Sequence, residues 1–188
     1  MENVQTALTV IGKLLEQKQN AVIAIEGRCG AGKTTFAALC AERFGAEVIH
    51  TDDFYLPFAK RAPDWTKIPG GNMDFARFNE EIALPIRRRE GSRYRKYNCR
   101  KNSFSEPIEL IAQGPVIVEG SYGRHPEVQL EYDLSIYLTC SQETQKKRLE
   151  EREGSYYPAF EAQWIPAEES YSKICSIIES SDLVVCTE

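Results

Sequence analysis

The sequence has few residues of the kind that build metal centres. Only two of its 188 residues are histidines, and no C-x-x-C pair occurs among its six cysteines. Because zinc sites need several such ligands at short spacing, we expect no zinc site. Scattered thiols of this kind are typical of reduced proteins in the cytoplasm. The six thiols are Cys29, Cys40, Cys99, Cys140, Cys175 and Cys186.

Long apolar runs and a basic charge surplus are also missing. No apolar stretch approaches the ~20 residues that span a bilayer. The first residues, Met1 to Val4, lack the basic segment and apolar core of a signal peptide. The formal net charge of −5 argues against a general nucleic-acid binder, since such proteins are usually basic. We therefore expect a cytoplasmic protein without membrane or nucleic-acid partners. The sequence leaves open whether the protein forms a homo-oligomer.

Short apolar runs alternate with helical stretches along the whole chain. With 27% charged and 42% hydrophobic residues, the composition is that of one ordinary domain, residues 1–188. The alternation predicts an α/β fold with a doubly wound, mostly parallel, five-stranded sheet and flanking helices. The expected strands are 21–25, 47–50, 115–120, 134–138 and 182–186. The expected helices are 3–18, 35–44, 74–88, 142–153 and 168–179.

Two stretches do not fit this alternation. Residues 54–73 are rich in proline and glycine and are expected to form a loop. Residues 91–107 are basic and aromatic, and we interpret them as a hairpin or flap, although such a charge run is often only a solvated face. In the helix expected over 74–88, Asp74 suits the N-cap, and Pro85 should bend or end the helix.

A phosphate-binding loop lies between the first expected strand and the helix that follows it. Residues 27–34 read Gly-Arg-Cys-Gly-Ala-Gly-Lys-Thr and fit G-x-x-x-x-G-K-[ST]. Glycines allow backbone N–H groups to face the phosphates, Lys33 can reach the β- and γ-phosphates, and the Thr34 hydroxyl can hold Mg²⁺. A glycine turn with a chance lysine would not need the order strand, loop and helix. The predicted nucleotide-binding residues of this segment are Gly27, Arg28, Cys29, Gly30, Ala31, Gly32, Lys33, Thr34 and Thr35.

Two features of GTPases are absent, namely an Asn-Lys-x-Asp sequence and an Asp-x-x-Gly segment after an apolar strand. ATP with Mg²⁺ is therefore the expected cofactor. Cys29 lies inside the loop, where the local field would favour a thiolate. It is either a small tolerated side chain or a site of redox control.

Acidic residues follow two of the expected strands. Asp52 and Asp53 come after strand 47–50, and Glu119 ends the strand over 115–120. Carboxyl ends of parallel strands line the ligand crevice of such a sheet, so these acids could accept a proton from an attacking hydroxyl or position Mg²⁺. One member of the adjacent pair could instead cap a turn. Because adjacent side chains diverge, we expect only one of the two aspartates to be catalytic.

The charged helix 142–153 carries Arg148 and Arg152 four residues apart and hence on one face. They could pair with glutamates of the same helix. Alternatively, they could donate guanidinium groups to the transferring phosphate from a mobile lid over about 142–158, with a hinge at residues 154–158.

With these features the chain resembles the uridine kinase, phosphoribulokinase and pantothenate kinase group of P-loop small-molecule kinases. Four segments carry the resemblance, which extends from the phosphate loop to about Glu179. They are the phosphate loop, Thr-Asp-Asp-Phe-Tyr at 51–55, Val-Glu-Gly at 118–120, and the strand 132–138 followed by Arg148. The resemblance implies a P-loop NTPase fold with a helical lid.

The resemblance also implies roles for single residues. Asp52 matches the base that takes the proton of the acceptor hydroxyl, and Glu119 matches the acid that organises Mg²⁺. Asp74, in Asn-Met-Asp, matches an aspartate that holds sugar hydroxyls, and Tyr97 matches a tyrosine of the acceptor flap. The implied catalytic residues are Asp52, Lys33, Glu119 and Arg148. The implied acceptor-binding residues are Asp52, Tyr55, Asp74 and Tyr97, and the implied metal ligands are Thr34, Glu119 and Asp52.

One departure from the family pattern concerns the acceptor. Uridine kinases have a histidine shortly after the flap tyrosine, whereas this chain has Asn102 near that place and no histidine in the flap. The Lys- and Arg-rich flap would suit an acceptor that already carries a phosphate or carboxylate. The leading expectation is an ATP- and Mg²⁺-dependent kinase acting on a small-molecule hydroxyl, a nucleoside or ribose-like compound first. The alternatives are an ATPase or regulatory module without an acceptor, and a nucleoside-monophosphate kinase.

Overall fold

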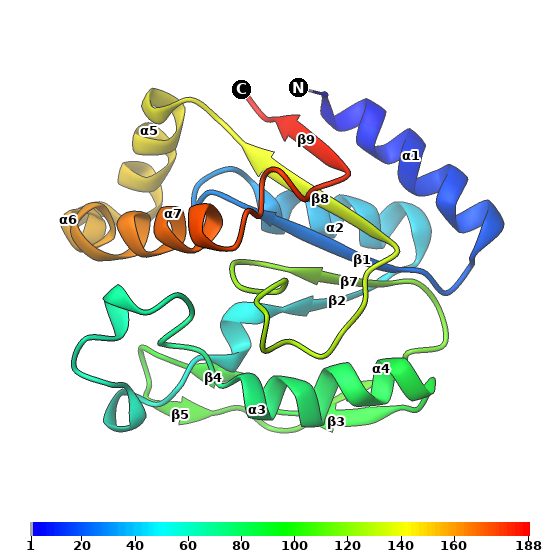
Figure 1. Cartoon of the computed structure of the whole chain (residues 1–188), viewed down its shortest axis with the longest axis horizontal. Helices are drawn as coiled ribbons and strands as arrows, with labels where there is room; N and C mark the ends of the chain where they lie inside the picture. The colour runs from blue at the N-terminus through cyan, green and yellow to red at the C-terminus, as the bar shows by residue number, and fades with distance from the viewer. Residues whose placement is uncertain (1) are drawn as a thin grey trace.

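A five-stranded parallel sheet forms the centre of the molecule. The computed structural model describes residues 2–188. The strand order is β2 (Glu47–His50), β7 (Val116–Glu119), β1 (Val22–Gly27), β8 (Leu134–Thr139) and β9 (Leu183–Cys186). All neighbouring pairs run parallel, so the carboxyl ends of the strands meet at one edge of the sheet, on the left in Figure 1. The predicted α/β class and the five strands are confirmed.

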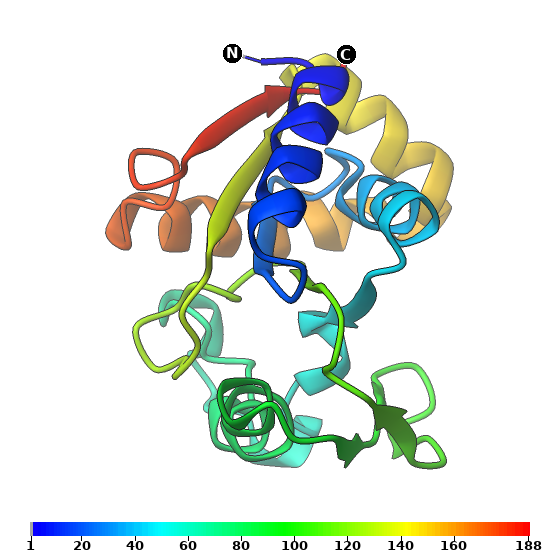
Figure 2. The ribbon, with the colours of Figure 1, turned by 90° about the vertical axis from the view of Figure 1, so that its right-hand side faces the viewer.

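Helices cover both faces of this sheet, as Figure 2 shows. Helices α1 (Val4–Gln17) and α2 (Lys33–Phe44) pack on one face, against alternate strand residues such as Ile23 and Ile25. The opposite face, which includes Val22, is covered by the helices that follow β2 and β8. Because both faces of the sheet are covered, successive side chains of a strand are buried on opposite faces, and the strand sequences are continuously apolar. In residues 2–188 no helix combines the length and apolarity needed to cross a membrane.

The helix expected over 74–88 continues to Arg88, so Pro85 does not end it. It consists of α3 (Phe75–Phe78), one wide π turn (Asn79–Ala83) and α4 (Leu84–Arg88). Proline has no N–H and its ring crowds the carbonyl four residues earlier, and the wider turn accommodates both. The Glu81 carbonyl, four residues before Pro85, accepts a hydrogen bond from Ser92 Oγ at 2.6 Å instead.

A second helical segment uses the same arrangement and differs from the predicted boundaries. A π turn (Phe160–Trp164) precedes Pro166 and joins α6 (Tyr157–Ala159) to α7 (Ile165–Ile174). The predicted helix 168–179 therefore begins too late and ends too late. We call the continuous segment 157–174 the cover helix, because it lies across the carboxyl edge of the sheet beside α5 (Gln142–Glu153) (Figure 1).

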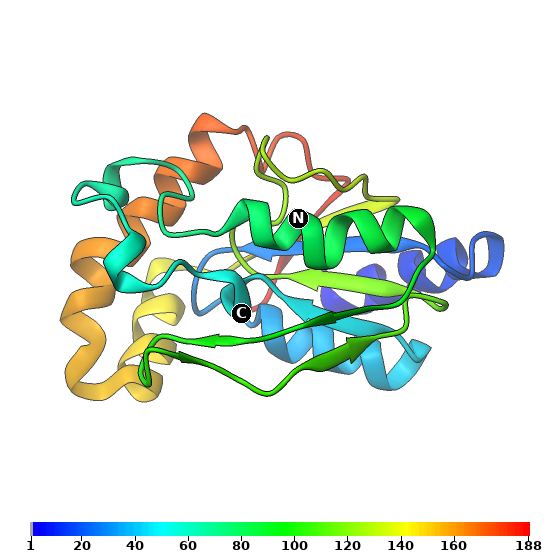
Figure 3. The ribbon, with the colours of Figure 1, turned by 90° about the horizontal axis from the view of Figure 1, so that it is seen from below.

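The basic stretch forms the predicted hairpin. Strand β3 (Ser92–Tyr94) pairs with β6 (Ile108–Leu110), and β4 (Tyr97–Asn98) pairs with β5 (Ser103–Phe104), both antiparallel. Figure 3 shows this flap extending alongside α3 and α4 toward the carboxyl edge of the sheet. There Arg100 of the flap lies 3.7 Å from the Glu153 carboxylate at the end of α5. The flap thus reaches the edge where the phosphate loop lies.

Candidate active site

The phosphate loop connects β1 to α2 in the geometry that the motif predicts. Gly30 and Gly32 have φ of 77° and 83°, and Gly27 has φ of 146°. A Cβ atom on Gly27 would lie 2.1 Å from the Leu138 carbonyl oxygen, so only glycine allows β1 and β8 to approach here. Lys33 Nζ donates to the Gly27 carbonyl at 2.7 Å, which places its ammonium over the beginning of the loop.

Beside the loop, Glu119 joins two other polar side chains. Thr34 Oγ1 donates to Glu119 Oε1 at 3.3 Å, and His50 Nδ1 contacts the same oxygen. Glu119 is 4% exposed, and its hydrogen bond raises the pKa of His50. The glycine after Glu119 has a steric reason, because a Cβ atom on Gly120 would lie 2.0 Å from Thr51 Oγ1. His50 was missed as a site residue, although its place at the end of a predicted strand could have indicated it.

These residues fit Mg²⁺ and a nucleoside triphosphate. Thr34 and Glu119 offer oxygen atoms, which are the ligands Mg²⁺ prefers, and the metal usually keeps waters and phosphate oxygens as its other ligands. Across residues 2–188 no three His, Cys, Asp or Glu side chains gather as a ready-made metal site. The open glycine loop supplies the backbone N–H groups for phosphate oxygens. The predicted metal ligand Asp52 stays a prediction.

Asp52 and Asp53 lie in a 3₁₀ turn after β2, and their side chains diverge. Asp52 Oδ1 accepts a hydrogen bond from Tyr55 OH at 2.7 Å, whereas Asp53 Oδ2 lies 3.2 Å from Lys96 Nζ of the flap. Desolvation by the surrounding protein raises the pKa of Asp52, and the hydrogen bond from Tyr55 opposes this shift. The charge of Lys33 also acts on this carboxyl. Asp53 therefore faces the flap, whereas Asp52 is held by Tyr55 and lies within electrostatic reach of Lys33 and Glu119.

The other two predicted acceptor residues are held in local contacts. Asp74 Oδ1 caps α3 by accepting from the Arg77 N–H at 3.1 Å. Asp74 also lines an open groove of about 290 Å³ between residues 56–76 and Glu127. Tyr97 OH donates to Asn102 Oδ1 at 2.6 Å inside the flap. Of the four predicted acceptor residues, the structure joins Tyr55 to Asp52 by a direct hydrogen bond, while Asp74 and Tyr97 have other partners.

The cations of the flap mostly have partners as well. Lys96 pairs with Asp53, Arg93 with Glu109 at 2.7 Å, and Arg100 with Glu153. Arg95 Nε donates to the Ser105 carbonyl at 2.6 Å. Three of the five flap cations are thus paired with acids, whereas Arg95 and Lys101 have no acidic partner among residues 2–188, so an anionic acceptor stays a prediction.

The two arginines of α5 share one face, as their spacing predicts, but their contacts differ. Arg148 donates to the Gly30 carbonyl at 3.3 Å and to Thr187 Oγ1 at 3.1 Å. It thus braces the outer side of the phosphate loop against the C-terminal segment. Arg152 is more exposed, donates to Glu153 Oε1 at 2.6 Å and lies 5.6 Å from the Phe160 ring centre. Phosphate binding by these two residues stays a prediction.

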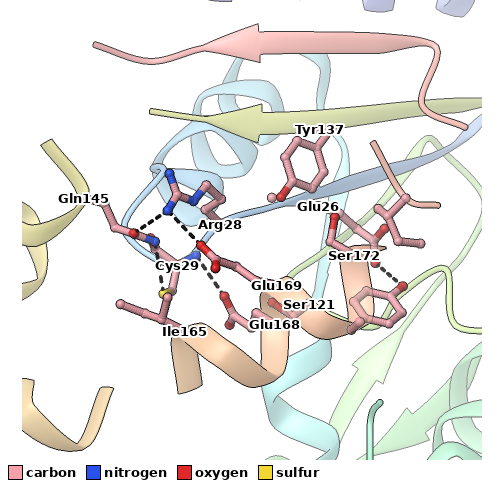
Figure 4. A pocket seen from close by; sticks show the side chains of 13 residues that line it. Glu26, Arg28, Cys29, Ser121, Tyr137, Gln145, Ile165, Glu168, Glu169 and Ser172 are labelled. Carbon is pink, nitrogen blue, oxygen red and sulfur yellow. Dashed lines mark hydrogen bonds and ion pairs between the residues drawn. The ribbon is translucent and has the colours of Figure 1, made fainter. Parts of the chain in front are cut away.

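A glutamate of the cover helix binds the phosphate loop directly, and the sequence did not indicate it. The Cys29 backbone N–H donates to Glu168 Oε2 at 2.9 Å, next to Arg28, which binds Gln145 Oε1 and Glu169 Oε1 at 2.9 Å each (Figure 4). No short-range pattern connects Glu168 with a loop about 140 residues earlier. The thiol of Cys29 is buried, and both burial and the charge of Glu168 raise its pKa. The expected tendency toward a thiolate is therefore wrong.

Aromatic side chains join the cover helix to the loop after Asp52. The ring centre of Trp164 lies 5.8 Å from that of Tyr55 and 5.1 Å from that of Trp65. Arg61 lies over the Phe58 ring at 4.4 Å beside them. This aromatic contact was also missed, because its members come from a predicted loop and from a helix whose start was placed too late.

Comparison with known proteins supports the fold that this site is built on. No protein-family model matches the chain, and no relative was found among curated proteins. A Bacillus stearothermophilus protein described as a possible uridine kinase matches in structure with a TM-score of 0.73 and 17% identity, over 96% of this chain and 98% of that chain. A Silicibacter sp. TM1040 protein assigned as a fructose transport system kinase matches with a TM-score of 0.76 and 19% identity, over 98% and 99%. The chain therefore has the P-loop NTPase fold, in the form that these two proteins share.

Proposed function

We propose that this protein is a kinase that transfers the γ-phosphate of ATP, with Mg²⁺, to a hydroxyl group of a small molecule. The observation that carries the proposal is Asp52, a carboxylate just after β2 that is held by Tyr55 OH at 2.7 Å and lies within electrostatic reach of Lys33 and Glu119. A module that only binds or hydrolyses nucleotide has no need of a carboxylate positioned for an acceptor. The structural neighbours, described as a possible uridine kinase and a fructose transport system kinase, agree with this choice.

Each residue has a distinct part in the proposed reaction. Lys33 and the loop N–H groups bind and orient the phosphates, while Thr34 and Glu119 hold the metal, which when bound neutralises developing charge on the phosphate oxygens. Asp52 accepts the proton of the acceptor hydroxyl. A carboxylate held in this place can take that proton as the hydroxyl attacks.

The charges around Asp52 favour a neutral acceptor. Glu119 and Glu168 both act electrostatically on Asp52, and the flap cations Lys96 and Arg100 are paired with Asp53 and Glu153. An acceptor that carries a phosphate or carboxylate would meet repulsion from these acids. A nucleoside or another ribose-like compound remains the first choice, with uridine itself disfavoured by the missing flap histidine.

The test is an ADP-release screen over nucleosides, free sugars, pantothenate, phosphosugars and nucleoside monophosphates. ADP release should be slow with ATP alone and should rise sharply with one neutral hydroxyl compound. Stimulation by nucleoside monophosphates but by no free alcohol would establish the nucleoside-monophosphate kinase instead. Fast release that no acceptor changes would establish the ATPase module.

A further inference from the structure

The cover helix connects the phosphate loop with the aromatic contact on the acceptor side. Glu168 binds the Cys29 N–H at 2.9 Å, and Trp164, four residues earlier, lies against Tyr55 and Trp65. Residues four apart lie on the same face of a helix, about one turn from each other. One helical segment therefore touches both sides of the site.

The contact of Glu168 is the kind that a phosphate oxygen makes. A carboxylate oxygen accepts a hydrogen bond from an N–H of the glycine-rich loop, and such N–H groups are the ones that receive phosphate in this fold. The charge of Glu168 also acts on Asp52 and on Tyr55 of the acceptor side. A bound triphosphate would place a second anion in this region.

We propose that Glu168 is a positioning residue that occupies the phosphate loop as a surrogate anion until the nucleotide binds. This inference rests on the proposed kinase function. Binding of the triphosphate releases the Cys29 N–H from Glu168 through competition and repulsion between like charges. The cover helix then shifts, and Trp164 carries the shift to Tyr55 and Trp65. Nucleotide binding thereby adjusts the acceptor side before the second substrate arrives.

The contacts of the helix favour a movement of the part that precedes Tyr171. Phe160 and Ile165 pack only partly buried against a small cluster of Cys29, Leu149 and Tyr157. Farther along, Tyr171 OH donates to the buried Glu26 at 2.9 Å and holds the end of the helix against β1. The wide turn at residues 160–164 lies between the hinge at Gly154 and the Glu168 contact, where a helix can readily change its winding.

The chain supplies its own reporter for this shift. Trp65 and Trp164 are its only two tryptophans, and both lie in the aromatic contact. Tryptophan emission therefore reports on the acceptor side alone, while nucleotide affinity reports on the phosphate side. Both can be measured without turnover.

The experiment compares wild type, Glu168→Gln and Glu169→Gln by calorimetry with the Mg²⁺ complexes of β,γ-imido-ATP and ADP, and by tryptophan emission. Glu168→Gln keeps an oxygen that can accept from Cys29 but removes the charge. It should bind imido-ATP about fivefold to tenfold more tightly, since a charged hydrogen bond becomes a neutral one. Glu169→Gln removes the same charge from the neighbouring, exposed position, and its amide oxygen can still accept from Arg28, so it should change the affinity less than twofold.

Emission of the wild type should change when imido-ATP saturates it, and Glu168→Gln without nucleotide should already be shifted toward that value. Equal affinities of wild type and Glu168→Gln, or nucleotide binding without a change in emission, would overturn the inference and leave the proposed kinase intact. Absence of any nucleotide binding by the wild type would overturn the proposed function itself.

Discussion

The phosphate side of the site is built around one contiguous stretch, residues 22–34, to which Glu119 is added, whereas the acceptor side is assembled entirely from segments far apart in the sequence. On the phosphate side, backbone N–H groups and the end of a buried strand do most of the positioning. On the acceptor side, side chains of the loop after β2, the flap and the cover helix meet through Tyr55, Lys96 and Trp164. Substitutions should therefore act differently on the two sides.

The largest effect is expected at Asp52, where the two sides meet. Asp52→Asn keeps the shape and the hydrogen bond from Tyr55 but removes the proton acceptor, so turnover should fall by about 10²–10⁴ with nucleotide affinity little changed. Asp53→Asn is the matched control. It should cost much less, because Asp53 faces Lys96 of the flap. Turnover at saturating ATP, and ADP affinity in a separate binding measurement, show for both variants which aspartate is the base.

The reverse outcome, an inactive Asp53→Asn and a working Asp52→Asn, would exchange the roles of the two aspartates. It would also mean that the flap, and not the phosphate side, holds the acceptor hydroxyl.

The second-largest effect is expected on the phosphate side alone. Lys33→Ala removes the ammonium above the loop, and charged hydrogen bonds contribute about 1.5–3 kcal/mol, so nucleotide affinity should fall roughly tenfold to a hundredfold together with turnover. Lys13→Ala, at an exposed position of α1, controls for the loss of charge. Calorimetry with ADP and Mg²⁺ measures the change. An unchanged affinity would show that the loop is not the phosphate site.

The same contrast explains how far the sequence could predict the structure. The strand, glycine loop and helix over 21–44 are specified by neighbouring residues, and Lys33 and Thr34 lie where the pattern places them. The position of Glu119 near the phosphate loop could also be predicted, because parallel strands end at one edge of the sheet, and Glu119 does lie beside Thr34. Glu168 could not be predicted, because its partner is the backbone N–H of Cys29 and any residue type supplies that group. The start of the cover helix was missed because Pro166 is usually a boundary, and here a wide turn absorbs it.

A smaller effect is expected from the aromatic contact of the acceptor side. Trp65→Leu keeps an apolar side chain but removes the aromatic pair with Trp164, worth about 0.5–1.5 kcal/mol. The KM for the acceptor should rise about twofold to tenfold, while the KM for ATP stays nearly constant. Tyr156→Leu, at an aromatic position that is 68% exposed, is the control. Steady-state kinetics with both substrates varied measures the two KM values. If both rose together, the acceptor side and the phosphate side would not be separate.

The smallest expected effect concerns Glu26, which joins the two sides at the end of β1. Its Oε1 accepts from Tyr171 OH of the cover helix at 2.9 Å and from the Arg124 N–H at 3.1 Å, and the residue is 2% exposed. The Arg124 guanidinium is 4.0 Å from its other oxygen, too far for a strong ion pair. Burial therefore raises the pKa of Glu26 above its ordinary value of 4.5, since the charged form is poorly solvated.

The raised pKa sets the sign of a pH dependence. Above pH 4.5 the unfolded chain releases this proton while the native protein retains it, so the contribution of Glu26 to stability declines as pH rises, until the native pKa is passed. Glu26→Gln cannot titrate, and its free energy of unfolding should decline less steeply over this window. Asp52 and Asp53 titrate in both proteins, so their contributions cancel in the difference. Urea unfolding from pH 4.5 to 8.5 measures it. Parallel curves for the two proteins would show that Arg124 and Tyr171 compensate the buried charge fully, and that the cover helix is joined to β1 without an electrostatic cost.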